Sequence, residues 1–224
     1  MANNKTKAAG DSGEVKQKSV FREYAEAIGI ALLLALFIRT FIVQAFKIPS
    51  GSMENTLLIG DHIIVTKYSY GIHIPNEVLV LGTQLFKDIV LLQKVPERGD
   101  IIVFKFPRDE KRDFIKRVIG LPGDILEVKR QRVFINGQPY ADPHARHTRP
   151  PPDESFKPRD DFGPVRVPEG HVFVMGDNRE NSEDSRYWGF LDIKKIRGKA
   201  QFIYWSWNGP ESSIRFDRFG QLLE

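Results

Sequence analysis

A serine on a tight turn and a lysine inside an apolar run are the two candidate reactive groups of this sequence. Ser52 lies in residues 48–53 (Ile-Pro-Ser-Gly-Ser-Met), where Pro49 fixes one backbone dihedral angle and Gly51 permits conformations that a side chain would forbid. A turn of this kind can hold a hydroxyl in the strained, exposed position that a nucleophile requires. Taken alone, the pattern is more often that of an ordinary loop turn.

Lys116 is the candidate base, because it is the only lysine inside the strongly apolar run of residues 114–119. A lysine amine with its ordinary pKa of about 10.4 is protonated at neutral pH and accepts no proton. Burial in an apolar environment lowers that pKa by several units and makes the amine available as a base. The alternation of a β-strand also allows Lys116 to face solvent, and composition by itself favours that simpler arrangement.

Other kinds of chemistry find no support in the sequence. There is no cysteine, which excludes disulfides, cysteine-ligated zinc and a thiol nucleophile. The GxSxG, HExxH, P-loop and GxGxxG motifs are absent. His144 and His147 have no further ligand at suitable spacing, so we expect neither a metal nor another cofactor. The polar loop of residues 176–189 fails the calcium-loop template, since Arg179 and Ser182 stand where a carboxylate or amide and a glycine are needed.

The charge balance argues against a nucleic-acid partner. The net charge is only +4, and the charged residues, 28% of the chain, are interspersed rather than clustered. A modestly basic chain is equally compatible with an anionic membrane surface.

The N-terminal part predicts a membrane anchor. Residues 1–23 form a polar tail that we expect to be disordered. Residues 24–46 follow as a strongly apolar run, and about 23 helical residues reach roughly 35 Å, enough to span a bilayer. A cleaved signal peptide and a buried core helix are the alternatives, although the run exceeds the usual apolar region of about 7–15 residues in signal peptides. The basic residues ahead of it place the N-terminus in the cytoplasm.

The remaining residues, 47–224, predict an all-β domain, so the expected fold class is mainly β with a single N-terminal transmembrane helix. Short apolar runs, one of them at 78–81, are separated by Gly-Asp, Pro-Gly-Asp and Asn-Gly turns, as is typical of a barrel or sandwich. Asn136-Gly137 predicts a β-hairpin. Residues 141–164, rich in proline and charge, predict a variable loop.

Four sequence blocks, in order, resemble the type I signal peptidases, also called leader peptidases. The blocks are residues 48–53, 98–104, 114–124 and 176–189, the last reading GDNRENSEDSRYWG. These enzymes are membrane-anchored serine proteases with a Ser/Lys dyad on an all-β fold. The resemblance implies an endopeptidase that removes N-terminal signal peptides from exported preproteins and cuts after small residues in an Ala-x-Ala pattern.

The resemblance also assigns roles to individual residues. Ser52 matches the nucleophile and Lys116 the general base. The backbone N–H of Ser52 and the hydroxyl of Ser50 match the oxyanion hole. The other matches support the dyad or bind substrate: Ser182 orients the lysine, Asp184 and Arg186 form a supporting ion pair, Phe46, Ile48 and Ile115 line pockets for small side chains, and Asp113 begins the strand edge (residues 113–116) that pairs with an extended substrate.

The setting that the resemblance implies is the bacterial plasma membrane, with the catalytic domain outside the cytoplasm. Preproteins are the expected substrates, and membrane lipid and the secretion translocase are the expected partners. Asn55 departs from the family pattern, which usually has proline there, and we expect this to loosen the turn after Ser52.

Three alternatives stay open. A self-cleaving repressor protease shares the Ser/Lys chemistry but lacks a membrane span. A catalytically inactive, membrane-tethered β module would have no reason to keep Ser50, Ser52, Lys116 and Ser182 together. A maturation peptidase dedicated to one substrate would cleave no ordinary preprotein.

Overall fold

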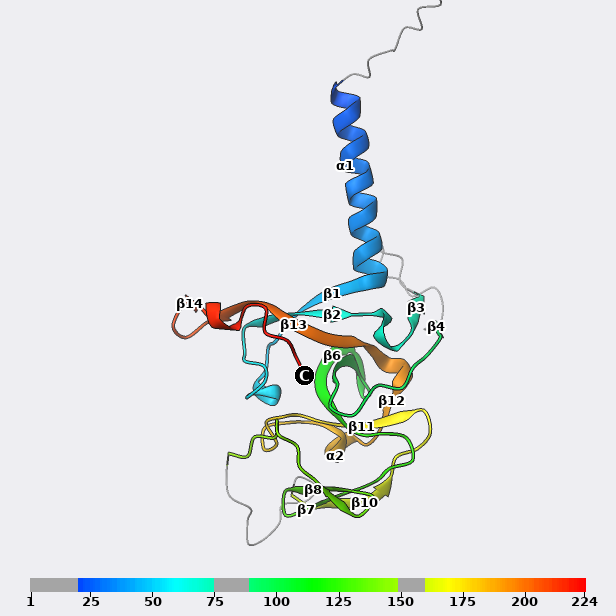
Figure 1. Cartoon of the computed structure of the whole chain (residues 1–224), viewed down its shortest axis with the longest axis vertical. Helices are drawn as coiled ribbons and strands as arrows, with labels where there is room; N and C mark the ends of the chain where they lie inside the picture. The colour runs from blue at the N-terminus through cyan, green and yellow to red at the C-terminus, as the bar shows by residue number, and fades with distance from the viewer. Residues whose placement is uncertain (1–19, 75–88, 149–159) are drawn as a thin grey trace, which may run out of the picture. The chain divides into compact units, whose positions relative to one another are not determined.

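The computed structural model describes residues 20–74, 89–148 and 160–224. The chain divides into two units, Met1–Phe37 and Ile38–Glu224, and each is described by itself (Figure 1). The predicted disordered tail, the strand predicted at 78–81 and the middle of the predicted 141–164 loop lie outside the described residues.

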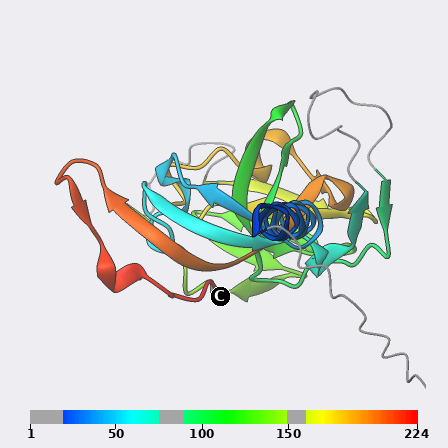
Figure 2. The ribbon, with the colours of Figure 1, turned by 90° about the horizontal axis from the view of Figure 1, so that it is seen from above.

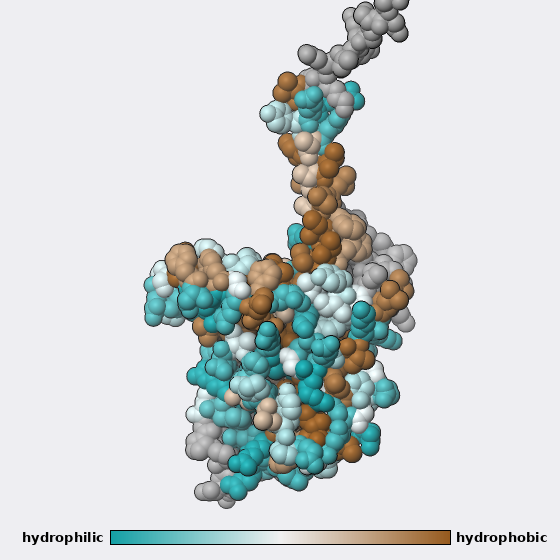
Figure 3. All heavy atoms as spheres, in the orientation of Figure 1, coloured by the Kyte–Doolittle hydropathy of each residue, from teal (hydrophilic) through white to brown (hydrophobic). Residues whose placement is uncertain are grey.

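The first unit contains one apolar helix, α1 (Val20–Phe37), in which no residue is buried. Alanine and leucine, which favour helices, dominate its second half. Together with the π-helical turn η1 (Ile38–Ile42), the stretch Val20–Ile42 has a mean hydropathy of 2.0 and is long and apolar enough to cross a membrane. Hydrophobic side chains are exposed along α1 beyond its polar N-terminal turns in Figure 3, which argues against the buried-core-helix alternative.

The apolar run predicted as one span over 24–46 is divided in the structure. The helix begins earlier, at Val20, and the last residues of the run form strand β1 (Val43–Lys47). β1 pairs antiparallel with β2 (Asp61–Thr66), with Val43 opposite Thr66. The β-branched residues that accumulate after Phe37 disfavour a helix and suit a strand, which explains where the helix ends.

The main sheet of the second unit has eight strands within the described residues, in the order β1-β2-β13-β5-β6-β11-β12, with β14 on β13. Its other strands are β5 (Ile101–Phe106), β6 (Asp109–Gly120), β11 (His171–Met175), β12 (Leu191–Asp192), β13 (Ile196–Asn208) and β14 (Ser213–Ile214). The long β13 runs between β2 and β5 and is seen as a curved orange ribbon beside cyan β2 in Figure 2. β5 and β6 form the antiparallel hairpin that carries Lys116.

Two smaller sheets complete the β structure of the described residues. One has the order β10-β7-β8-β9, and the other pairs β3 with β4. Their strands are β7 (Ile125–Lys129), β8 (Arg132–Ile135), β9 (Gln138–Tyr140), β10 (Phe162–Arg166), β3 (Ile72–Ile74) and β4 (Ile89–Leu91). The predicted hairpin is confirmed between β8 and β9, where Asn136 (φ 53°) and Gly137 (φ 79°) are both left-handed, as a type I′ turn requires.

Short helical turns join the strands: η2 (Gly51–Met53), η3 (Tyr68–Tyr70), α2 (Ser185–Trp188), η4 (Ile193–Lys195) and η5 (Phe216–Arg218). Three buried apolar clusters form the core of the second unit. The first cluster includes Met53 and Leu57, both 0% exposed, so the residues just after Ser52 are anchored in the core. The predicted fold class, mainly β after one apolar N-terminal helix, is confirmed.

We expect Gly198→Ala to lower the free energy of unfolding by about 2–4 kcal/mol. A Cβ on Gly198 would lie 2.2 Å from the carbonyl oxygen of Thr66, so β13 and β2 would have to separate. Denaturant unfolding of the whole chain in detergent, followed by tryptophan fluorescence, measures the change. Gly209→Ala is the matched control, because a Cβ there meets no atom within 4 Å. Equal stability of the two variants would contradict this close approach.

Candidate active site

The turn that carries Ser52 is held at both ends by the backbone. The N–H of Ile48 donates to the carbonyl of Asp61 (2.8 Å), and the N–H of Gly60 donates to the carbonyl of Ile48 (3.0 Å). Ser52 lies in η2 and is only 8% exposed. The residue is therefore largely buried, contrary to the expected exposed pose, because the adjacent Met53 packs in the core; Ser52 still lines the cleft described below.

Asn55, where the family pattern has proline, takes a left-handed conformation with φ of 99°. Proline cannot adopt this angle, whereas asparagine tolerates it better than most residues. The turn closes immediately afterwards, since the N–H of Leu57 donates to the carbonyl of Met53 (2.8 Å). The hydroxyl of Thr56 then donates to Asp177 Oδ2 (2.5 Å), which ties the turn to the loop after β11. With asparagine in place of the family's proline, the backbone at position 55 thus follows a path that a proline could not take.

Lys116 lies in β6 with its amine turned toward the turn that carries Ser52. Its Nζ donates to Ser52 Oγ (2.7 Å) and to the carbonyl of Ile115 (2.8 Å), and the residue is 3% exposed. The solvent-facing alternative for Lys116 is wrong, because β6 is buried on both faces from this residue to Gly120. Desolvation by burial lowers the pKa of Lys116 to about 8, although the carboxylates of Asp184 and Asp177 oppose this shift.

The ion pair of Asp184 and Arg186 stands in the loop after β11. Arg186 Nε and Nη2 donate to Asp184 Oδ1 and Oδ2, both at 2.8 Å, and Asp184 is 0% exposed. Asp184 also caps α2 and accepts the N–H of Gly176 (3.1 Å). Burial raises the pKa of Asp184, but the Arg186 guanidinium outweighs burial and holds the pKa below its usual range. The predicted pair therefore forms, and it orders the loop from within.

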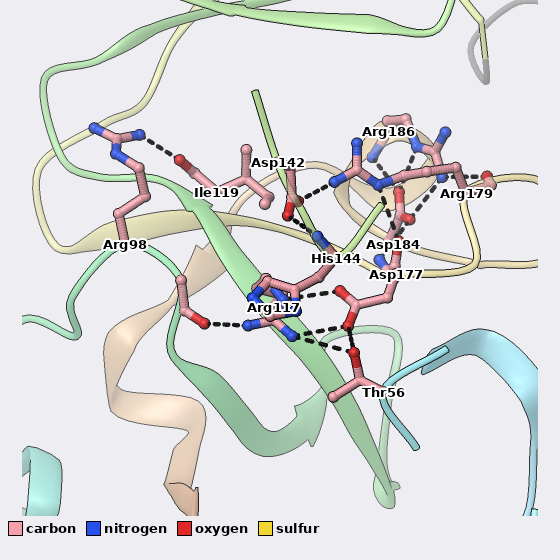
Figure 4. A network of polar contacts seen from close by, with 12 residues as sticks. Thr56, Arg98, Arg117, Ile119, Asp142, His144, Asp177, Arg179, Asp184 and Arg186 are labelled. Atoms are coloured by element: carbon pink, nitrogen blue, oxygen red, sulfur yellow. Dashed lines mark hydrogen bonds and ion pairs between the residues drawn. The ribbon is translucent and has the colours of Figure 1, made fainter. Parts of the chain in front are cut away.

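A second buried ion pair joins Arg117 to Asp177, and the sequence did not predict it. Arg117 Nε and Nη2 donate to the two carboxylate oxygens of Asp177, both at 2.9 Å, and neither residue is exposed (Figure 4). Arg117 Nη1 also donates to the carbonyls of Gly99 (2.7 Å) and Glu224 (2.6 Å). Strand alternation puts Arg117 on the face opposite Lys116, so both faces of β6 bury a cation. The signals in the sequence were an arginine inside the apolar run 114–119 and an aspartate two residues after the apolar β11.

Ser182 lies close to the dyad but does not contact Lys116 at hydrogen-bonding geometry in the described structure. Its Oγ is buried and meets no partner at that geometry, although the hydroxyl helps to lower the pKa of Asp184. A Cβ built on Gly176 would lie 2.3 Å from Ser182 Oγ and 2.4 Å from the carbonyl oxygen of Ser52. Gly176 therefore allows the loop and the nucleophile turn to approach each other.

A cleft of about 690 Å³ opens above Ser52 and Lys116. Its walls come from residues 49–52, from residues 112–116 of β6, and from residues 180–183 with Tyr187. Ser50, Asp113 and Ile115 thus line it as expected. Phe46 is partly buried against the first core cluster, and Ile48 is 2% exposed within it, so neither belongs to these walls.

One edge of β6 is unpaired along this cleft among the described residues. β5 pairs with β6 from Asp109 to Arg117, with Lys105 opposite Asp113 and Ile102 opposite Lys116. On the other edge, the pairing with β11 begins only at Arg117. Residues 113–116 are consequently not paired with a second strand at the wall of the cleft, although the carbonyl of Ile115 accepts a hydrogen bond from Lys116 Nζ.

Comparison with known proteins assigns the chain to a family. The family profile described as "Signal peptidase, peptidase S26" matches residues 21–205. The chain belongs to the signal peptidase family. It is 35% identical to the signal peptidase I of Pseudomonas fluorescens over 245 aligned residues, covering 93% of this chain and 82% of that protein. It is 38% identical to the signal peptidase I of Bacillus licheniformis over 196 residues, covering 86% of this chain and 92% of that protein.

Membership of the signal peptidase family confirms the predicted resemblance to type I signal peptidases. The chain is a serine peptidase that acts on preproteins bearing signal peptides. This excludes the self-cleaving repressor proteases and the inactive β module as alternatives. The apolar helix and the family together indicate a membrane-anchored protein.

We expect Gly176→Ala to reduce kcat by about 10²-fold, because displacements of about 1 Å in an active site have effects of this size. The added methyl group overlaps the carbonyl oxygen of Ser52 and the hydroxyl of Ser182, so one of them must move. The measurement is cleavage of a preprotein by the detergent-solubilised chain, with Gly209→Ala as the glycine-to-alanine control. A wild-type kcat for Gly176→Ala would show that the close contact of Gly176 with Ser52 and Ser182 is unimportant for catalysis.

Proposed function

We propose that Ser52 is the nucleophile and Lys116 the general base in signal-peptide removal. The observation that carries the proposal is the buried contact of 2.7 Å between Lys116 Nζ and Ser52 Oγ. A neutral Lys116 amine takes the hydroxyl proton while Ser52 Oγ attacks the scissile carbonyl. The ammonium then gives its proton to the leaving amine, and an acyl-enzyme remains. Water attacks that ester with the same amine as base, which restores Ser52.

The oxyanion hole is assigned to the backbone N–H of Ser52 and the hydroxyl of Ser50. Both residues line the cleft, and Ser50 is in an extended conformation (φ −136°, ψ 156°) just before η2. Donors fixed by a short turn need no reorganisation as negative charge develops on the carbonyl oxygen. Ser182, beside the dyad on the opposite wall, is assigned to orient the lysine during the reaction.

The substrate is assigned an extended conformation along the unpaired edge of β6. A peptide that adds a strand gains affinity from main-chain hydrogen bonds, and its alternate side chains enter pockets. Ile115 lines the cleft, and Phe46 and Ile48 pack behind it in the same apolar cluster. The apolar Ile115 in the wall, with this apolar cluster behind it, suits small apolar side chains, which supports cleavage after Ala-x-Ala. The cation Arg197 pairs with Asp113 (2.8 Å) and fixes the start of this edge.

The orientation assigned to the protein is an N-terminus in the cytoplasm and a catalytic domain outside the bacterial plasma membrane. The apolar stretch Val20–Ile42 supports an anchor, and basic residues precede it. An anchor of this kind keeps the cleft at the membrane surface, where the secretion translocase would deliver cleavage sites and where lipid would contact the helix.

We expect Ser52→Ala to reduce preprotein cleavage by about 10⁴-fold or more, because it removes the attacking atom. Lys116→Ala is expected to reduce it by about 10²–10⁴-fold, the usual contribution of a general base. The measurement is the rate at which a preprotein with an Ala-x-Ala site is cut in detergent or liposomes, with mass spectrometry of the product.

Lys129→Ala is the matched control for the lysine, because Lys129 is exposed on β7 and forms an ion pair with the nearby Glu127. Near-normal activity of Lys116→Ala would assign the base to another group. A wild-type chain that cuts its own cognate preprotein but no ordinary one would favour the dedicated maturation peptidase.

The pH dependence of kcat/KM follows from the lowered pKa of Lys116. Only the neutral amine accepts the Ser52 proton, so the rate is expected to rise about tenfold per pH unit up to a pKa of about 8 and to level off above it. Initial rates from about pH 6 to pH 10, in buffers of equal ionic strength, test this. A constant rate between about pH 6 and pH 8 would contradict a lysine base with this pKa.

A further inference from the structure

A short segment far from the dyad in sequence lies along the outside of the loop after β11. We call residues 142–148 the strap. The N–H of Arg146 donates to the carbonyl of Asp177 (2.7 Å), and the N–H of Arg179 donates to the carbonyl of Arg146 (3.0 Å), which makes a parallel bridge with Asn178. The backbone of the strap is thus hydrogen-bonded alongside the backbone of the loop, as two neighbouring strands are.

Side chains fasten the strap at its two ends. Asp142 pairs with Arg179, and the two side chains are 2% and 4% exposed (Figure 4). At the other end, Glu180 accepts the N–H of Thr148 (2.6 Å) and contacts His147 Nδ1 (2.9 Å). Since Glu180 also lines the cleft, the strap supports the cleft wall from behind.

Arg146 also reaches the opposite wall of the cleft, which carries the nucleophile. Its Nη1 donates to Glu54 Oε2 (3.1 Å), two residues after Ser52. Asn178 Nδ2 donates to the same carboxylate oxygen (3.2 Å) and to the carbonyl of Gly51 (3.1 Å). The N–H of Asn178 donates to the carbonyl of Ser52 (3.2 Å). Arg146, Glu54 and Asn178 therefore form a junction that joins both walls beside the nucleophile.

The orientation of the Asn178 amide depends on this junction. Its Oδ1 is buried and has no hydrogen-bond partner in the described part of the chain, so only the two bonds from Nδ2 fix the side chain. One of the two acceptors is Glu54, whose side chain is 32% exposed. A cation beside a carboxylate restricts where that carboxylate can lie. Removal of the Arg146 guanidinium would leave Glu54 mobile and the amide with one firm acceptor.

We propose that Arg146 is a positioning residue, which fixes the turn carrying Ser52 through Glu54 and Asn178. This inference rests on the proposed role of Ser52. The strap stays docked without the guanidinium, because its backbone bonds and the buried Asp142 pair do not involve that group. Loss of the guanidinium is therefore expected to change catalysis and leave folding unchanged.

The expected effect is modest because the Arg146 and Glu54 side chains are 45% and 32% exposed, and solvent screens their attraction. We expect Arg146→Gln to lower kcat about three- to fivefold on a preprotein substrate, with KM and the unfolding temperature unchanged. Arg146→Lys, which keeps a cation, is expected to lose less activity than Arg146→Gln. Arg132→Gln is the matched control, since Arg132 is exposed on β8 of another sheet.

A double-mutant cycle with Glu54→Gln tests whether Arg146 acts through Glu54. Because a glutamine at position 54 can still accept from Asn178, it removes the ion pair and keeps the neighbouring bond. If the pair acts as a unit, the double variant is no slower than the slower single variant. The proposal would be overturned if the kcat losses of the two single variants multiplied in the double variant, or if Arg146→Gln had the wild-type kcat. It would also be overturned if Arg146→Gln lost activity together with a fall in its unfolding temperature.

Ser52→Ala, measured in the same assay, separates this inference from the proposed function. If Ser52→Ala is inactive and Arg146→Gln has the wild-type kcat, the positioning role alone is wrong. If Ser52→Ala stays active, the proposed nucleophile is wrong and the positioning role is overturned with it.

Discussion

The burial of the Lys116 amine against Ser52 is the constraint on which the rest of the site depends. An ammonium group removed from water loses much of its hydration energy, which favours the neutral amine and lowers the pKa to about 8. The nearby carboxylates of Asp184 and Asp177 act in the opposite direction. Each of them is held by an arginine in a bidentate pair, Arg186 for the first and Arg117 for the second. Because their charge is largely compensated in this way, burial remains the dominant influence on Lys116.

The two buried ion pairs therefore affect the charge around Lys116 as well as the stability of the fold. A buried pair often contributes little net free energy, since desolvation of both charges offsets their attraction. Here the pairs fix the loop after β11 while they limit the negative charge near the lysine. Arg117 also donates to the carbonyl of Glu224, so this ion pair ties residue 224 to the strand that carries Lys116.

Strand β6 carries, in consecutive residues, the unpaired edge proposed to bind substrate, the proposed base and a buried supporting arginine. Residues before Arg117 leave one edge unpaired at the cleft, Lys116 presents its amine to Ser52, and Arg117 begins the pairing with β11. The change from open edge to paired edge occurs where the reactive group stands. The loop after β11 and the strap then hold the facing wall against the turn of Ser52, which makes the cleft a joint product of segments distant in sequence.

Much of the fold could be predicted from local patterns. The apolar stretch before residue 43, the short strands between Gly- and Pro-containing turns, and the Asn136-Gly137 hairpin each follow from neighbouring residues, because helix, strand and turn preferences act over short distances. The roles proposed for Ser52 and Lys116 rest on motif order, whereas a strand pattern alone favoured a solvent-facing lysine. Asn55 shows the limit of motif reading, since its left-handed conformation lies outside what the family's proline allows.

Tertiary structure alone decided the features that depend on distant partners. The pairing of β1 with β2 ended the apolar helix before Phe46, and the core drew in Ile48. Arg117 found Asp177 sixty positions along the chain. A period of two residues in a strand tells which side chains share a face but not whether a face is covered. The cover of β6 comes from the turn at Ser52 on one side and from the loop after β11 on the other, so the sequence determined the reactive groups and folding determined their burial.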